Sequence, residues 1–189
     1  MADSRRNVFS VGTHDVLVEI ECHLSNSLPA IVIVGSANKS VDEAKERLRG
    51  AFTSSLLQLP RKRIAVNLAP ADIPKTDSSF DLAMAAAILH ASNQIPEKCL
   101  QSTAVIGELG LDGSVRSTRG IIGKLLTARK LGISRFVIPQ SSLLQAQLVP
   151  YITLIPVKDL KQFYNYLATG LGVDALETHE GVLSLDTSA

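Results

Sequence analysis

The sequence predicts an α/β fold in which a mixed sheet and helices form two layers, an α+β arrangement. Three observations indicate this class. Short apolar segments with strand periodicity alternate along the chain with longer segments of helical periodicity. The length of 189 residues suits one domain of ordinary size. The hydrophobic fraction of 46% is typical of a folded globular protein with a substantial core.

The first part of the chain predicts strands followed by an amphipathic helix. Residues 16–24 alternate apolar and polar side chains, as a half-buried strand does, and residues 30–34 form a short apolar run. Residues 25–27 supply turn-forming side chains between them, so we expect a hairpin. A charged amphipathic helix over 40–57 and a strand over 63–68 follow.

The middle of the chain predicts an enclosed helix and a second hairpin. Residues 80–90 read FDLAMAAAILH and are apolar on every side apart from one acidic residue in the first turn, which is typical of a helix buried inside a domain. Strands are expected over 103–111 and 114–117. The Asp112-Gly113 dipeptide between them favours a tight hairpin turn.

The remaining elements continue the alternation of helices and strands. The pattern predicts a helix over 119–131, a strand over 135–138, a short helix over 141–147, a strand over 152–156 and a helix over 157–167. We therefore expect one domain over residues 1–169. Residues 170–189 are predicted to be a flexible C-terminal tail, because the periodicity fades there into acidic and small residues.

Composition excludes several functions and predicts the compartment. The 19 Lys and Arg residues balance 18 Asp and Glu residues, so bulk charge gives no support to binding of nucleic acid. No apolar run approaches the roughly 18 residues that span a bilayer, and the start MADSRRN does not resemble a signal peptide. We therefore expect no membrane association and a cytoplasmic protein. Cys22 and Cys99 match no metal-site spacing and are interpreted as reduced thiols, with no metal or cofactor.

One local basic cluster stands out against this balance of charge. Arg61, Lys62 and Arg63 lie together between a predicted helix and a predicted strand. The favoured interpretation is a solvated turn. Direct binding of nucleic acid through this cluster is the weaker alternative.

Two residues at a distance in the sequence suggest catalytic chemistry. Ser79 lies where a Pro-containing loop opens onto the predicted buried helix, and loops held by a rigid scaffold commonly carry function. Lys124 falls within the apolar arc of the helix over 119–131. A serine nucleophile needs a base, and a desolvated lysine can act as one. The structural alternatives are that Ser79 caps the helix and that Lys124 is a surface lysine.

Other catalytic patterns are missing from the sequence. There is no GxxxxGK[ST] phosphate loop, so this chain carries no ATPase motif. The glycines between residues 107 and 120 lie in a predicted hairpin rather than between a strand and a helix, which argues against a dinucleotide fingerprint. Glu108, Asp112 and Asp72 are carboxylates near turns, and we assign them structural roles. No histidine is better placed than Lys124 to act as a base for Ser79.

A set of motifs resembles, in order, the N-terminal domain of the magnesium-chelatase-subunit-I-like ComM/YifB family. The resemblance covers about residues 7–168. The motifs are PAIVIVG at 29–35, VDEAKERLR at 41–49, NLAPADIPK at 67–75, FDL at 80–82 and GELGLDGSVRSTR at 107–119. The resemblance implies a ribosomal-protein-S5-domain-2-like fold similar to the proteolytic domain of Lon.

The resemblance also implies two functions, and both remain open at this point. In the first, the chain is a stand-alone accessory or regulatory module for an AAA+ ATPase partner, or a homo-oligomer, with a possible place in DNA processing. In the second, it is a Ser-Lys peptidase of Lon type that cleaves peptides. The similarity to Lon places Ser79 at the nucleophile and Lys124 at the general base.

Overall fold

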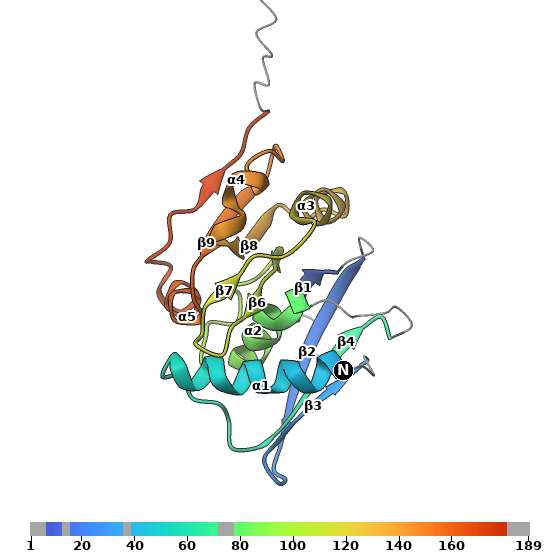
Figure 1. Cartoon of the computed structure of the whole chain (residues 1–189), viewed down its shortest axis with the longest axis vertical. Helices are drawn as coiled ribbons and strands as arrows, with labels where there is room; N and C mark the ends of the chain where they lie inside the picture. Colours follow the sequence, from blue (N-terminus) through green and yellow to red (C-terminus); the bar gives the residue numbers. More distant parts are fainter. Residues whose placement is uncertain (1–6, 13–15, 36–38, 72–77, 181–189) are drawn as a thin grey trace, which may run out of the picture.

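The structure is a computed structural model that describes residues 7–12, 16–35, 39–71 and 78–180 (Figure 1). The strands are β1 (Val8–Val11), β2 (Leu17–Ser25), β3 (Ala30–Val34), β4 (Arg63–Ala69), β5 (Thr103–Val105), β6 (Glu108–Leu109), β7 (Val115–Arg116), β8 (Arg135–Pro139), β9 (Thr153–Val157) and β10 (Leu176–Glu177). The helices are α1 (Lys39–Ser54), α2 (Asp81–Ala91), α3 (Ile121–Lys130), α4 (Leu143–Ala146) and α5 (Leu160–Thr169), with 3₁₀ turns at Ser78–Phe80 and Gln140–Ser142.

The predicted mixed sheet with helices is confirmed. Within the described residues, eight strands form one sheet in the order β10-β9-β8-β5-β1-β2-β4-β3, and β6 and β7 form a separate two-stranded ribbon. The pairings give β1, β3, β4, β5, β8 and β9 one common direction, while β2 and β10 run the opposite way. Ligand sites of α/β sheets lie at the carboxyl ends of parallel strands. A functional site is therefore expected at the end of the sheet where these strands terminate.

The predicted hairpin between residues 16–24 and 30–34 is wrong. The turn does reverse the chain, and the Ser27 N–H donates to the Ser25 carbonyl at 2.9 Å. However, β4 lies between β2 and β3, antiparallel to the first and parallel to the second. Ile64 of β4 is buried and is aligned with residues of both neighbouring strands. The turn residues predicted that the chain reverses its direction. They did not predict that β4, which comes later in the sequence, lies between β2 and β3.

The predicted strand over 103–111 is divided by Gly107 into two strands of different sheets. β5 belongs to the main sheet, whereas β6 pairs with β7 in the ribbon. The hairpin at Asp112-Gly113 is confirmed, and Gly113 adopts the left-handed φ of +86° that the turn requires. The strand β1 was not predicted from the sequence.

Helices cover the two faces of the sheet unequally. One core cluster joins α1, α2 and α5 to one face, and a second cluster joins α3 and α4 to the other face around β5, β8 and β9. Successive residues of β8 show the division, because Val137 belongs to the first cluster and its neighbours Phe136 and Ile138 to the second. Every residue of α2 from Asp81 to His90 is buried, so the predicted enclosed helix is confirmed.

Part of the segment predicted as a tail is held against the sheet. In β10, Leu176 aligns with Leu154 of β9, and the Tyr151 N–H donates to the Thr178 carbonyl at 2.9 Å. Both side chains of β10 are exposed, so this strand lacks the pattern of buried residues by which a strand is predicted. Residues 181–189 lie outside the described residues. None of the helices in the described part of the chain has the length and apolar character that crossing a membrane requires.

Candidate active site

Ser79 lies in the 3₁₀ turn that leads directly into α2, and its main chain is fixed to the segment after β5. The Gly107 N–H donates to the Ser79 carbonyl at 2.9 Å, and the Leu82 N–H donates to the Gly107 carbonyl at 3.0 Å. The alternative that Ser79 caps α2 is wrong. The N-cap of α2 is Phe80, and no side chain makes a capping hydrogen bond there. The Ser79 hydroxyl is therefore not the N-terminal cap of α2.

Lys124 reaches this hydroxyl from α3, on the other side of the sheet edge. Its Nζ donates a hydrogen bond to Ser79 Oγ at 3.1 Å. Ser79 is fully buried and Lys124 is only 2% exposed, so the alternative of a surface lysine is also wrong. The structure thus brings together the two residues singled out in the sequence, at hydrogen-bonding distance, beside the carboxyl end of β5.

The bulky residue after Ser79 is buried beside Gly12. Phe80 is 2% exposed. A Cβ atom on Gly12 would lie 2.8 Å from Cζ of the Phe80 ring, so the ring occupies the space that this glycine leaves. The phenyl group therefore packs into the core at the end of β1.

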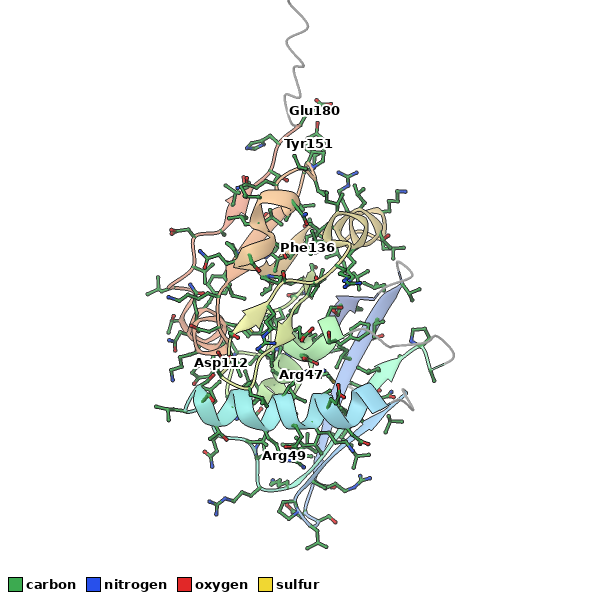
Figure 2. The ribbon with its side chains drawn as sticks, viewed as in Figure 1. Arg47, Arg49, Asp112, Phe136, Tyr151 and Glu180 are labelled. Carbon is green, nitrogen blue, oxygen red and sulfur yellow. The ribbon has the colours of Figure 1, made fainter. Side chains whose placement is uncertain are left out.

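Asp81 anchors the start of α2 through a buried ion pair. Arg47 of α1 donates from Nε to Oδ2 of Asp81 at 2.6 Å and from Nη2 to Oδ1 at 3.1 Å. The Leu109 N–H adds a third bond to Oδ2 at 3.1 Å. Figure 2 shows Arg47 on the side of α1 that faces α2, and Arg49 on the opposite side. α1, α2 and the β6–β7 ribbon are thereby joined two residues after Ser79.

Burial and the partners of Asp81 act on its carboxyl in opposite directions. Burial raises the pKa of Asp81 to about 6, while the hydrogen bonds from Arg47 and Leu109 and the charge of Arg47 lower it. Arg47 was not among the site residues predicted from the sequence. Like Lys124, it is a charged residue within an apolar helical stripe, here between Ala44 and Ala51, and this signal could have found it.

Glu108 and Asp112, two of the carboxylates near turns, have separate hydrogen-bond partners. Glu108 accepts a hydrogen bond from the Ser78 hydroxyl. Asp112 accepts bonds from the N–H and hydroxyl of Ser114, which lower the pKa of this exposed carboxyl. Asp72 lies outside the described residues. Among the residues that the structure does describe, no three His, Cys, Asp or Glu side chains form a cluster that could hold a metal ion.

His90 lies away from Ser79. His90 is at the opposite end of α2, where its Nε2 lies 3.6 Å from Cys99 Sγ. Burial raises the pKa of Cys99 to about 11 and that of Cys22 to about 12, so both are unreactive thiols at neutral pH. His14 lies outside the described residues.

The close packing around Gly107 yields a prediction for the site. A Cβ atom there would lie 2.9 Å from Val115 Cγ1 and 3.2 Å from Leu82 Cδ2. Gly107→Ala should therefore lower the free energy of unfolding by about 1–3 kcal/mol through overpacking. Denaturant unfolding would measure this loss. The loss should shrink when Val115→Ala is also present, and an equal loss in both backgrounds would contradict the proposed clash.

Comparisons with known proteins show which family the chain resembles. The family model described as subunit ChlI of Mg-chelatase matches residues 20–142, well over half of the chain. The competence protein ComM of Haemophilus influenzae is 44% identical over 121 residues, which cover 64% of this chain and 24% of that protein. The uncharacterized protein YifB of Escherichia coli is 37% identical over 123 residues, covering 65% of this chain and 24% of that protein.

A more distant similarity extends to proteases. An archaeal Lon protease of Methanocaldococcus jannaschii is 29% identical over 133 residues, which cover 67% of this chain and 20% of that protein. The chain spans between 20% and 32% of the length of these relatives and of the mycobacterial proteins that it also matches.

Proposed function

The chain belongs to the family of subunit ChlI of Mg-chelatase, with ComM and YifB among its relatives, and from this premise we propose that it is a Ser-Lys peptidase of Lon type. The observation that carries the proposal is the hydrogen bond of 3.1 Å between Lys124 Nζ and Ser79 Oγ. A nucleophile and its base must lie within such reach for the proton to pass directly. The more distant similarity to a Lon protease supports the same chemistry.

In the proposed reaction, Ser79 Oγ attacks the carbonyl carbon of a peptide bond, and Nζ of Lys124 acts as the base that takes the hydroxyl proton. Lys124 then gives this proton to the departing amine as the C–N bond breaks, which leaves an acyl group on Ser79. A water molecule, deprotonated by Nζ of Lys124, then attacks the acyl carbon. The bond from this carbon to Ser79 Oγ breaks, Lys124 returns the proton to Ser79 Oγ, and the acyl group leaves as a carboxylic acid. The overall reaction consumes one water molecule per peptide bond.

The charge that develops on the carbonyl oxygen needs hydrogen-bond donors. We propose that N–H groups near the start of α2, which follows the nucleophile closely, supply these donors. The Leu82 N–H already donates to the Gly107 carbonyl and is not assigned this role. The ion pair of Asp81 with Arg47 holds this helix start in place.

Burial of the site favours a second candidate function. Ser79 is fully buried, so a peptide can contact its hydroxyl only if the groups covering it move apart. In this alternative the chain is a non-catalytic accessory module that binds an AAA+ ATPase partner, with which proteins of this family usually work, or a second copy of itself. A place in DNA processing and a location in the cytoplasm belong to the same proposal.

A serine-directed fluorophosphonate probe separates the two functions. The wild-type chain should be labelled, and mass spectrometry of its peptides should locate the label on Ser79. Ser79→Ala should abolish labelling. Ser78→Ala is the matched control, because it removes the adjacent hydroxyl, which is bonded to Glu108, and should leave labelling intact. Labelling that persists in Ser79→Ala, or a wild-type chain that is never labelled and yet binds an AAA+ protein, contradicts the peptidase.

A further inference from the structure

We infer that a basic pocket at the opposite end of α2 from Ser79 binds an acidic segment of a partner protein. The pocket has a volume of about 390 Å³ and is lined by the end of β2, the segment between α1 and β4, and the residues that follow α2. Figure 1 shows the segment between α1 and β4 at the foot of the view, beside the turn that joins β2 to β3. The proposed peptidase reaction does not use this region.

The walls of the pocket are fixed by hydrogen bonds, so the pocket exists before a ligand arrives. The Gln94 side-chain amide donates to the Gln58 carbonyl at 2.9 Å, which joins the end of α2 to the segment before β4. The Gln94 N–H donates to the Leu89 carbonyl at 2.9 Å, which ties this residue to the helix. The Ala30 N–H donates to the Lys62 carbonyl at 3.4 Å. A preformed site loses little conformational entropy on binding.

The charge of the pocket is positive and uncompensated. Arg61 and Lys62 line it, Arg63 follows directly, and all three are exposed. Within the described part of the chain none of them forms an ion pair with another residue, and no acidic side chain lines the pocket. The exposure of these residues agrees with the solvated turn that the sequence favoured. Their position at a concave surface also gives them the arrangement of an anion site.

The rest of the lining favours a peptide over a nucleic acid. Leu24, Pro60 and Ala91 contribute apolar surface, which suits an apolar side chain lying between acidic ones. The side-chain amides of Gln58 and Asn93 make no hydrogen bonds to residues that the structure describes, so both are available to a peptide main chain. No aromatic side chain lines the pocket, whereas sites for single-stranded nucleic acids usually stack bases on aromatic rings.

Two exposed leucines lie close in the sequence to the residues that line the pocket. Leu56 precedes Gln58 by two residues and is 88% exposed. Leu28 lies in the turn before Ala30 and is 85% exposed. Exposed large apolar side chains are a common feature of protein-binding surfaces. The partner segment is therefore expected to combine aspartate or glutamate with leucine-like residues.

Fluorescence anisotropy tests the inference on the intact chain. The probe is a short fluorescein-labelled peptide in which Asp and Glu residues alternate with Leu, and the same peptide with Asn and Gln is its neutral counterpart. At low ionic strength the acidic peptide should bind and the neutral one should not. The double variant Arg61→Gln/Lys62→Gln, which changes exposed side chains only, should weaken binding on the order of tenfold.

A control and a competitor keep the test decisive. Lys130→Gln/Lys158→Gln removes the same charge from exposed positions elsewhere and should leave the affinity unchanged. Ser79→Ala should also leave it unchanged, so the outcome is independent of the peptidase. Equal weakening by both double variants would reduce the effect to bulk charge and overturn the proposal. Displacement of the peptide by an equimolar amount of single-stranded oligothymidylate would overturn it in favour of nucleic acid.

Discussion

Lys124→Met is expected to lower kcat/KM for peptide cleavage by about 10²- to 10⁴-fold, the usual contribution of a positioned general base. Methionine keeps the apolar length of the side chain between α3 and the sheet but cannot accept the Ser79 proton. Substitutions that conserve side-chain volume in a packed core usually cost less than about 1.5 kcal/mol. The variant should therefore unfold at close to the wild-type temperature while its activity is lost.

This combination separates a catalytic lysine from one that only supports the fold, because a structural role would lower stability together with activity. Lys130→Met is the control, since it changes an exposed lysine in the last turn of the same helix. Steady-state assays with a fluorogenic peptide should place Ser79→Ala, Lys124→Met and the double variant at one common residual rate, as expected of residues that act as a unit. Full activity in Lys124→Met would end the proposed role of its amine.

Arg47→Met is expected to lower the free energy of unfolding at pH 8 by about 3–5 kcal/mol, because it leaves a buried carboxylate without its charged partner. Asp81 is 1% exposed, and Arg47 supplies two of its three hydrogen bonds. The loss is large compared with the total stability of a domain of this size. Denaturant titrations over a range of pH would measure it.

The loss of stability in Arg47→Met should depend on pH in a defined direction. The pKa of Asp81 is already raised from 3.8 to about 6 by burial with Arg47 in place, and removing the guanidinium raises it further. The folded variant then binds a proton more tightly than the unfolded chain. Its free energy of unfolding therefore falls as the pH rises above about 6, and it is regained as the pH is lowered toward 5. Arg49→Met, which breaks the exposed pair with Glu46, should change stability by about 1 kcal/mol or less. A loss for Arg47→Met that is independent of pH would contradict the buried pair.

The sequence contained enough information to predict the candidate site because both of its residues violate a local pattern. Lys124 interrupts an apolar helical stripe, and Ser79 stands at the mouth of a helix without a polar face. Arg47 interrupts a stripe in the same way but was overlooked among the many charges of α1. Only the fold shows that its partner is Asp81, from a helix 34 residues away.

The strand order was the part of the fold that local patterns could not predict. Each strand of the first half was identified, apart from β1, yet the pairing of β2 with β3 was wrong because turn residues specify a reversal and not a distance. The tertiary fit of β4, whose Ile64, Val66 and Leu68 are buried between its neighbours, decides the arrangement. The identity of the helix cap was missed for a similar reason, since the main chain of Ser79 is fixed by Gly107 rather than by the helix that follows.

The insertion of β4 also has a consequence for synthesis on the ribosome. Among the described strands, β3 pairs only with β4, so a nascent chain that ends before residue 63 leaves β3 without this neighbour in the sheet. Its apolar side chains Ile31 and Ile33 then stay uncovered through the translation of roughly thirty further residues. This interval is when the emerging polypeptide is most exposed to aggregation, and when a chaperone that shields apolar strands would protect it most.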